Sequence, residues 1–215
     1  MTFPMGRRFI RTESFAKELI MRTIFLSRRA VLKNIAVTLS VAACGGFPRP
    51  SRADAGKKTL ILLYSWSGNT RSLARQIHDR IGGELVELLP TVPYTDNYND
   101  CVDQAKKELA QNVFPPLQPL PVSVNDYDTI LLGSPNWWGS WSGPARTFLH
   151  ANNLAGKNVL PFSTHGGGAW QNMLRDLKAF CPEAVIRKGL TVRDGSVGKA
   201  GPQVDDWLKA AGLLA

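Results

Sequence analysis

Residues 65–70 (SWSGNT) concentrate side chains that can bind an anion. Three hydroxyls and one amide occur within six positions, between an apolar run at residues 59–64 and a helical pattern at residues 72–81. The first N–H groups of a helix have no partner within the helix, and the helix dipole favours negative charge beside them. Capping of the helix by a Ser or Thr would account for one such residue but not for four. The segment therefore predicts a phosphate-binding loop.

Several classes of phosphate-binding protein are disfavoured because the residues that their chemistry needs are missing. A P-loop requires a Lys before its Ser or Thr, and a dinucleotide-binding turn requires three spaced glycines where only Gly68 occurs. Low-molecular-weight tyrosine phosphatases also place Gly-Asn before Arg-Ser, but their nucleophile is a thiolate and no Cys lies near this segment. A response-regulator receiver would need Asp where the chain has Tyr64 and Gly133.

Two later segments also follow apolar runs and are rich in Gly, Ser and Trp. Residues 133–141 (GSPNWWGSW) hold three of the six Trp residues, and a loop cannot easily bury all three. A flat, partly apolar ligand stacked on one of them explains the cluster better than core packing does. Residues 163–168 (STHGGG) are nearly all small, so their backbone N–H groups can approach a ligand closely.

The string from His165 to Gly168 also matches the oxyanion-hole signature of lipases and esterases. Those enzymes need a Gly-x-Ser-x-Gly elbow, and the nearest string, residues 139–143 (GSWSG), has Trp141 at its centre. A hydrolase is therefore disfavoured. His165 is interpreted as an ordinary loop residue, with tuning of a cofactor's protonation as the alternative.

The three segments lie where strand and helix patterns alternate along the chain. Apolar runs predict five strands, the last interrupted by Gly189: residues 59–64, 84–89, 129–133, 158–164 and 184–192. Helical periodicity predicts helices at residues 72–81, 98–110, 144–150, 169–180 and along the stripe Val204, Trp207, Leu208 and Ala211. This alternation is typical of an α/β fold with a parallel sheet, whose ligands bind beyond the carboxyl ends of the strands.

Together, and in this order, the three segments resemble the flavin-binding loops of the flavodoxin family over residues 58–215. The resemblance implies a three-layer doubly wound fold, a five-stranded parallel sheet in the order 2-1-3-4-5, and FMN as the cofactor. In that family the first segment holds the phosphate, the second lines the flavin ring and the third holds the ring's polar edge. The candidate cofactor-binding residues are Ser65, Trp66, Ser67, Gly68, Asn69, Thr70, Ser134, Pro135, Asn136, Trp137, Trp138, Gly139, Ser163, Thr164, His165, Gly166 and Gly167. The same topology implies that Cys101 and Cys181 lie at opposite ends of the domain and are unpaired.

No residue of the three segments is a compelling acid–base catalyst and no metal site is predicted, so the flavin would carry the chemistry. We expect a redox protein that passes electrons between its FMN and a protein or quinone-like partner. Trp137, Trp138 and Trp141 are expected to be exposed beside the ring, where they would suit docking. Two alternatives stay open: an NAD(P)H-dependent FMN oxidoreductase of the quinone-reductase type, and a flavodoxin-shaped binding module without flavin.

Positive charge concentrates at the N-terminus. Residues 1–55 hold ten Lys or Arg and three Asp or Glu, a net charge of +7, so residues 56–215 supply only +2 of the overall +9. Electron-shuttling flavodoxins are typically strongly acidic and cytoplasmic. Because residues 56–215 are near neutral, the redox partner of this part of the chain (the body) stays open. The charge of the body gives no case for nucleic-acid binding.

Residues 21–55 resemble a twin-arginine export signal, with Arg28 and Arg29 before an uncharged run that is too short to span a membrane. Cleavage before Gly56 would release a soluble protein. A competing lipoprotein-type site would leave Cys44 as a lipid anchor. Residues 1–20 are interpreted as a non-functional extension upstream of Met21, and residues 56–215 as the FMN-binding domain. The predicted location is periplasmic or otherwise extracytoplasmic in a bacterium.

Overall fold

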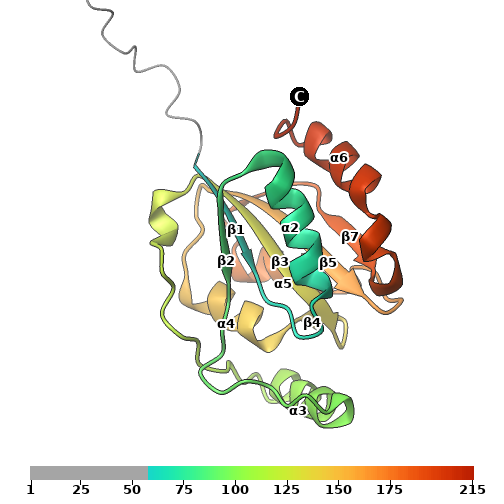
Figure 1. The fold of residues 1–215 in the computed structure, drawn as a ribbon. Coiled ribbons are helices and arrows are strands. Elements are labelled where there is room, and N and C mark those ends of the chain that lie inside the picture. The colour runs from blue at the N-terminus through green and yellow to red at the C-terminus, as the bar shows by residue number, and fades with distance from the viewer. Residues whose placement is uncertain (1–57) are drawn as a thin grey trace, which may run out of the picture. The chain divides into compact units, whose positions relative to one another are not determined.

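The computed structural model describes residues 58–215 (Figure 1). The predictions for the upstream extension, the export signal, its two cleavage sites and Cys44 fall outside the described residues.

A parallel sheet forms the centre of the described domain. β1 (Thr59–Leu63) lies between β2 (Glu84–Glu87) and β3 (Thr129–Trp137), and β5 (Asn158–His165) pairs with the other side of β3. Two short strands, β6 (Val185–Ile186) and β7 (Leu190–Arg193), both pair with β5. The order β2-β1-β3-β5, followed by β6 and β7, confirms the predicted doubly wound α/β fold, with β6 and β7 together in the place of the fifth strand.

Helices cover both faces of the sheet (Figure 1). One face carries α2 (Asn69–Ile81), the 3-10 helix η2 (Asp194–Lys199) and α6 (Gly201–Ala210), and the other carries α4 (Gly143–Ala151) and α5 (Met173–Phe180). Successive residues of β1 enter opposite cores, so Ile61 packs on the α2 side and Leu62 on the α4 side. Burial on both faces is the reason why this strand is an unbroken apolar run. Among the described helices, none is long and apolar enough to cross a membrane.

α3 (Tyr98–Ala110) does not cover a face of the sheet but lies beyond the carboxyl ends of the strands (Figure 1). Asn97 caps its first turn by accepting hydrogen bonds from the N–H groups of Asn99 and Asp100. The chain after α3 contains four prolines between residues 115 and 121. It is fixed to the segment between β2 and α3, because Thr91 N–H donates to the Pro116 carbonyl and Gln118 N–H to the Leu89 carbonyl. It leads through the 3-10 helix η1 (Val124–Asp126) into β3.

The structure moves several predicted boundaries. β3 continues past Gly133 to Trp137 and turns back at Trp138 into the antiparallel strand β4 (Ser140–Trp141), so half of the predicted second loop is a β-hairpin. The helix predicted from residue 169 begins at Met173, because Ala169 and Gln171 have left-handed φ values of 49° and 43°. α2 begins at residue 69 rather than 72.

The chain between β6 and β7 requires glycine at position 189. A Cβ atom at this position would lie 2.6 Å from the Trp170 ring and 2.7 Å from the Pro161 carbonyl oxygen. Only glycine fits such a close approach. The fifth strand is divided between β6 and β7, where the sequence analysis placed its interruption.

Candidate functional site

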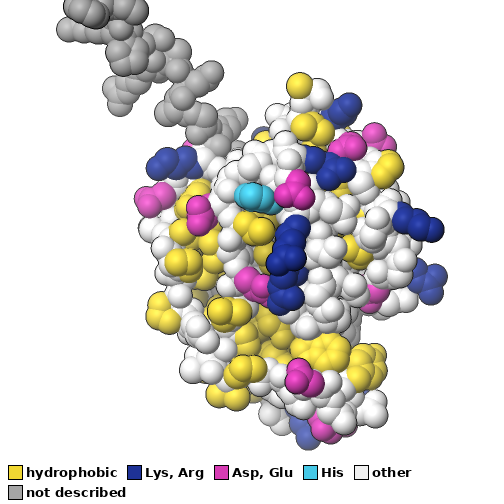
Figure 2. Space-filling view, viewed as in Figure 1, with side chains coloured by type: hydrophobic (Ala, Val, Ile, Leu, Met, Phe, Trp, Pro, Cys, Tyr) yellow, Lys and Arg dark blue, Asp and Glu magenta, His cyan; other side chains and the backbone are white. Residues whose placement is uncertain are grey.

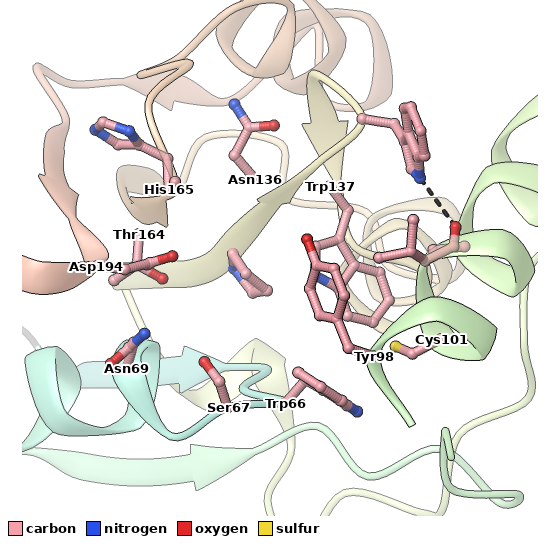
Figure 3. Close-up of a pocket in the computed structure, with 15 residues that line it drawn as sticks. Trp66, Ser67, Asn69, Tyr98, Cys101, Asn136, Trp137, Thr164, His165 and Asp194 are labelled. Carbon is pink, nitrogen blue, oxygen red and sulfur yellow. Dashed lines mark hydrogen bonds between the residues drawn. The ribbon is translucent and has the colours of Figure 1, made fainter. Parts of the chain in front are cut away.

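A cavity of about 430 Å³ opens where β1, β3 and β5 end (Figure 3). This is the edge at which open α/β sheets bind their ligands. The three predicted segments supply one part of its wall, and α3 and the end of β7 supply the rest. The lining residues are Trp66, Ser67, Asn69, Tyr98, Cys101, Val102, Ala105, Pro135, Asn136, Trp137, Trp138, Thr164, His165, Gly166 and Asp194.

The β1–α2 segment presents an uncapped helix N-terminus at this cavity. Gly68 adopts a left-handed φ of 88° at the N-cap position, and no side chain accepts a hydrogen bond from the first turn of α2. That turn also contains no acidic residue. The hydroxyl oxygen of Ser65 is buried and has no hydrogen-bond partner among the described residues. Free N–H groups and a free hydroxyl together make this end of the cavity suited to an anion.

Arg71 stabilises the segment from behind without lining the cavity. Its guanidinium donates two hydrogen bonds of 2.7 Å to the Glu87 carboxylate on β2, and a longer one of 3.4 Å to the Ser65 carbonyl. The hydrogen bond with Glu87 raises the pKa of Arg71 above its ordinary value. The two charges compensate each other, and no Lys or Arg lines the cavity within the described chain.

The hairpin between β3 and β4 is held by Asn136. Its side-chain oxygen accepts a hydrogen bond of 2.9 Å from Gly139 N–H, while its amide nitrogen donates to the Ala169 carbonyl at 2.6 Å and to the Gln171 side chain at 3.1 Å. Although Asn136 lines the cavity, the hydrogen-bonding capacity of its carboxamide serves these neighbouring turns. These hydrogen bonds hold the turn at Trp138 and Gly139 against residues 169–171.

The three clustered tryptophans have three different environments. Trp141 is 1% exposed and donates from Nε1 to the Met173 carbonyl at 2.7 Å, so the expectation that it is exposed beside a ligand is wrong. It is buried because β4 turns the chain back over the start of α5. Trp138 is 49% exposed, donates from Nε1 to the Val102 carbonyl at 3.0 Å, and has Lys106 Nζ 4.9 Å from its ring centre.

Trp137 belongs to an aromatic cluster at the base of the cavity. Its ring packs edge-on against Tyr64 and Tyr94, with centroid distances of 5.5 and 5.0 Å. The Tyr94 hydroxyl donates to the Glu108 carboxylate. Burial, followed by that carboxylate, raises the pKa of Tyr94 well above its ordinary value, and burial likewise raises the pKa of Tyr64. Both phenols therefore stay neutral and pack behind Trp137, which itself lines the cavity.

The end of β5 contributes buried hydroxyls and one unpartnered imidazole nitrogen. The hydroxyls of Thr164 and Thr70 share a hydrogen bond of 2.8 Å. His165 Nδ1 is buried and has no hydrogen-bond partner among the described residues. A Cβ atom at Gly166 or Gly167 would meet no atom within 4 Å, so the protein leaves space at these glycines.

Comparison with known proteins identifies the domain. A family model described as Flavodoxin matches residues 58–211. The chain belongs to the flavodoxin family. Its sheet order, and the cavity at the carboxyl ends of β1, β3 and β5, are those that the family resemblance implied.

Three solved structures are similar to this flavodoxin-family domain. One, from Bacteroides uniformis and provisionally described as a flavoprotein, has 28% sequence identity and a TM-score of 0.64, covering 72% of this chain and 99% of its own. Another provisional flavoprotein, from Bacteroides eggerthii, has 25% identity and a TM-score of 0.60, with coverages of 71% and 96%. A flavoprotein from Lactobacillus acidophilus, solved in complex with FMN, has 29% identity and a TM-score of 0.56, with coverages of 66% and 97%.

The structure brings most of the predicted flavodoxin-type residues to one cavity. Ten of the seventeen line it, namely Trp66, Ser67, Asn69, Pro135, Asn136, Trp137, Trp138, Thr164, His165 and Gly166. The other seven lie in the same segments but do not line it: Ser65, Gly68, Thr70, Ser134, Gly139, Ser163 and Gly167. Some of these support the wall, since the Ser134 hydroxyl accepts from Ser142 N–H at 3.0 Å and the Ser163 hydroxyl lies 3.4 Å from Met173 Sδ.

Sequence analysis missed five lining residues, four of them on α3. Tyr98, Cys101, Val102 and Ala105 form one side of the helix that faces the cavity. The sequence predicted a helix at residues 98–110, but nothing in its pattern indicated that this helix faces a ligand cavity. Asp194, the fifth, follows β7 and had no distinguishing pattern around it.

Proposed function

We propose that this flavodoxin-family domain binds FMN in the cavity and functions as an exported electron-transfer protein. The observation that carries the proposal is a pair of buried polar atoms without partners. Only three such side-chain atoms occur in the described chain, and two of them, Ser65 Oγ and His165 Nδ1, lie in segments predicted to bind the cofactor. Buried polar groups are nearly always hydrogen-bonded. His165 lines the cavity and Ser65 directly precedes the lining residues Trp66 and Ser67, so a ligand that reached both atoms would remove an otherwise unexplained cost.

The cavity also fits FMN in size and chemistry. Its volume of about 430 Å³ falls within the range of small-molecule sites. The phosphate would be held by Ser67, Asn69 and the first N–H groups of α2, because these hydrogen-bond donors have no partner among residues 58–215. Trp66, Tyr98 and Trp137 supply flat apolar surface for the ring system. The related flavoprotein from Lactobacillus acidophilus was solved with FMN bound.

When bound, FMN supplies reversible electron transfer, which amino-acid side chains do not provide. The protein's contribution is to bind the flavin, orient it and exclude water. The aromatic rings that line the cavity, those of Trp66, Tyr98 and Trp137, would perform the last task.

We propose a protein or quinone-like partner because the cavity rim is apolar and exposed. Figure 2 shows apolar side chains gathered where α3 meets the carboxyl edge of the sheet. At this rim Tyr98 is 66% exposed and Trp138 is 49% exposed. A flat or apolar partner could contact these rings, and a body charge of +2 provides little long-range steering.

The first test is whether the purified protein carries FMN. We expect a yellow protein with about one non-covalent FMN per chain. Ser67→Ala should weaken FMN far more than riboflavin, which lacks the phosphate, because the lost hydrogen bond is to a charged group. A protein that is colourless and stays so after incubation with FMN would contradict the proposal and favour a flavin-free binding module.

The second test concerns the electron partner. Anaerobic stopped-flow absorbance should show fast oxidation of the reduced protein by quinones and only slow reduction of the oxidised protein by NADH or NADPH. Fast, saturable reduction by either nucleotide would contradict a carrier function. It would instead identify an NAD(P)H-dependent oxidoreductase.

A further inference from the structure

Arg146 on α4 is the one charged side chain that is buried within residues 58–215, with 4% of its surface exposed. Among the described residues, no carboxylate lies within ion-pair distance of its guanidinium. Burial lowers the pKa of Arg146 from its ordinary value. Because a buried charge is costly unless it is hydrogen-bonded, the partners of Arg146 indicate what this charge holds in place.

The partners of Arg146 are three consecutive residues just after α3. Its Nη2 donates to the Asn112 side-chain oxygen at 2.6 Å, and its Nη1 donates to the Val113 carbonyl at 3.4 Å. Its guanidinium carbon lies 4.9 Å from the centre of the Phe114 ring, a distance typical of a cation–π contact. All three contacts join α4 to one short segment at the end of α3.

Asn112 is also the residue that terminates α3. It adopts a left-handed φ of 53°, and its N–H donates to the Leu109 carbonyl at 3.2 Å. The next N–H, of Val113, donates to the Glu108 carbonyl at 2.8 Å. These two hydrogen bonds form the Schellman arrangement that closes a helix. The guanidinium of Arg146 therefore holds the carboxyl-terminal cap of α3.

The position of α3 matters to the cavity because this helix forms one wall of it without covering a face of the sheet (Figure 1). At the amino-terminal end of the helix, Trp66 donates from Nε1 to the Thr95 carbonyl at 3.0 Å. Trp138 donates to the Val102 carbonyl, as the dashed line in Figure 3 shows. Both tryptophans line the cavity, whereas Arg146 does not, so any effect of Arg146 on a ligand must pass through α3.

We propose that Arg146 is a positioning residue for the flavin site, which holds the cap of α3 and thereby keeps one side of this helix against the cavity. The inference rests on the proposed FMN site and extends it to a residue outside the cavity. The side chains of α3 that line the cavity carry no charge: they are Tyr98, Cys101, Val102 and Ala105. The contribution of Arg146 should therefore be the same for FMN, riboflavin and lumiflavin, which share the ring system but differ in the hydroxyl chain and the phosphate.

The test begins with Arg146→Met in the full chain, which removes the charge and its donors but keeps a long side chain. In the protein without flavin, iodoacetamide should alkylate Cys101 about tenfold faster than in the wild type, because a hydrogen bond from a charged group no longer holds α3. Cys181, which is free and buried at the end of α5, should react at an unchanged rate. Fluorescence titration should show all three flavins bound about tenfold more weakly, with the ratio of FMN to riboflavin affinity unchanged. Circular dichroism checks that the variant is folded.

Two further variants separate the hydrogen bond from the charge. Arg146→Lys keeps the charge but lacks the planar fork, so its affinities should fall between those of the wild type and Arg146→Met. Asn112→Gly keeps the left-handed φ and removes only the acceptor, so it should change both readouts in the same direction as Arg146→Met. Arg187→Met is the matched control, because Arg187 donates to the Asn158 side chain at 3.0 Å, at the start of β5 and away from the cavity. It should change neither readout.

Other outcomes would overturn the inference. Unchanged flavin affinities in folded Arg146→Met would mean that the arginine only stabilises the fold. Equal acceleration at both cysteines would indicate general loosening rather than movement of α3, and weakening of FMN alone would mean that the charge acts on the phosphate from a distance. If the wild-type chain bound none of the three flavins, the proposed function would be refuted, while the alkylation rates would still decide whether Arg146 positions α3.

Discussion

The hydroxyls of Thr70 and Thr164 lie 2.8 Å apart and connect the first turn of α2 to the end of β5, 94 residues later. Both side chains are at most 1% exposed, so water does not compete for this hydrogen bond. The bond fixes two predicted cofactor segments relative to each other. Because a hydroxyl has one proton, Thr70 can donate to a phosphate only when Thr164 is the donor in this pair.

We expect Thr70→Val and Thr164→Val each to lower the free energy of unfolding by about 1–2 kcal/mol, because each leaves a buried hydroxyl without its partner. The double variant should lose less than the sum, since the second substitution removes an orphaned group. Urea unfolding of the four proteins measures this coupling. Strict additivity of the two losses would mean that the hydrogen bond contributes nothing.

The two described cysteines, both free and buried, provide a matched pair for locating the ligand. Burial raises the pKa of Cys101 and of Cys181 to about 11. At pH 8 only about one thiol in a thousand is then ionised, so alkylation of both should be slow and should accelerate up to about pH 11. FMN should slow alkylation of Cys101, which lines the cavity, and leave Cys181 unaffected.

Peptide mapping by mass spectrometry after timed alkylation distinguishes the two sites. The unfolded protein, in which both cysteines should react quickly, is the control. Equal protection of Cys101 and Cys181 by FMN would indicate general stabilisation rather than a ligand against α3.

Trp141 and Trp138 should differ strongly in their effect on stability. Trp141→Ala removes a fully buried ring and should lower the free energy of unfolding by about 3–5 kcal/mol. Trp138→Ala should cost less than about 1.5 kcal/mol, because the ring is half exposed and loses one hydrogen bond. Chemical unfolding followed by circular dichroism measures both, and similar losses would contradict the burial difference.

Replacing Arg28 and Arg29 by Lys should block export while leaving expression intact, if residues 21–55 act as a twin-arginine signal. Cell fractionation and immunoblotting would detect the change. Normal export of the double variant would make the arginine pair incidental. Mass spectrometry of the mature N-terminus would then distinguish cleavage before Gly56 from a lipidated Cys44.

The sequence alone predicted the α/β class and the edge of the sheet at which the site lies, while the strand order was implied by the resemblance to the flavodoxin family. Residues 60–63 are apolar without interruption because both faces of β1 are covered, and that pattern is local. The segments that follow β1, β3 and β5 must meet at one edge because parallel strands end on the same side. Gly189 likewise marked the interruption of the last strand in the sequence. Glycine is required there because no side chain fits beside Trp170 and Pro161.

Only the tertiary structure decided which residues complete the cavity. Periodicity shows that one side of α3 is apolar, but not that this side faces a cavity beyond the sheet rather than the sheet itself. The position of α3 depends on contacts between distant residues, such as the hydrogen bond from Trp138 to Val102, 36 residues earlier in the chain. For the same reason Trp141 is buried and Trp138 exposed although they lie three positions apart. Burial depends on which segments the chain brings back over a residue, and the residue's own neighbours in sequence do not carry that information.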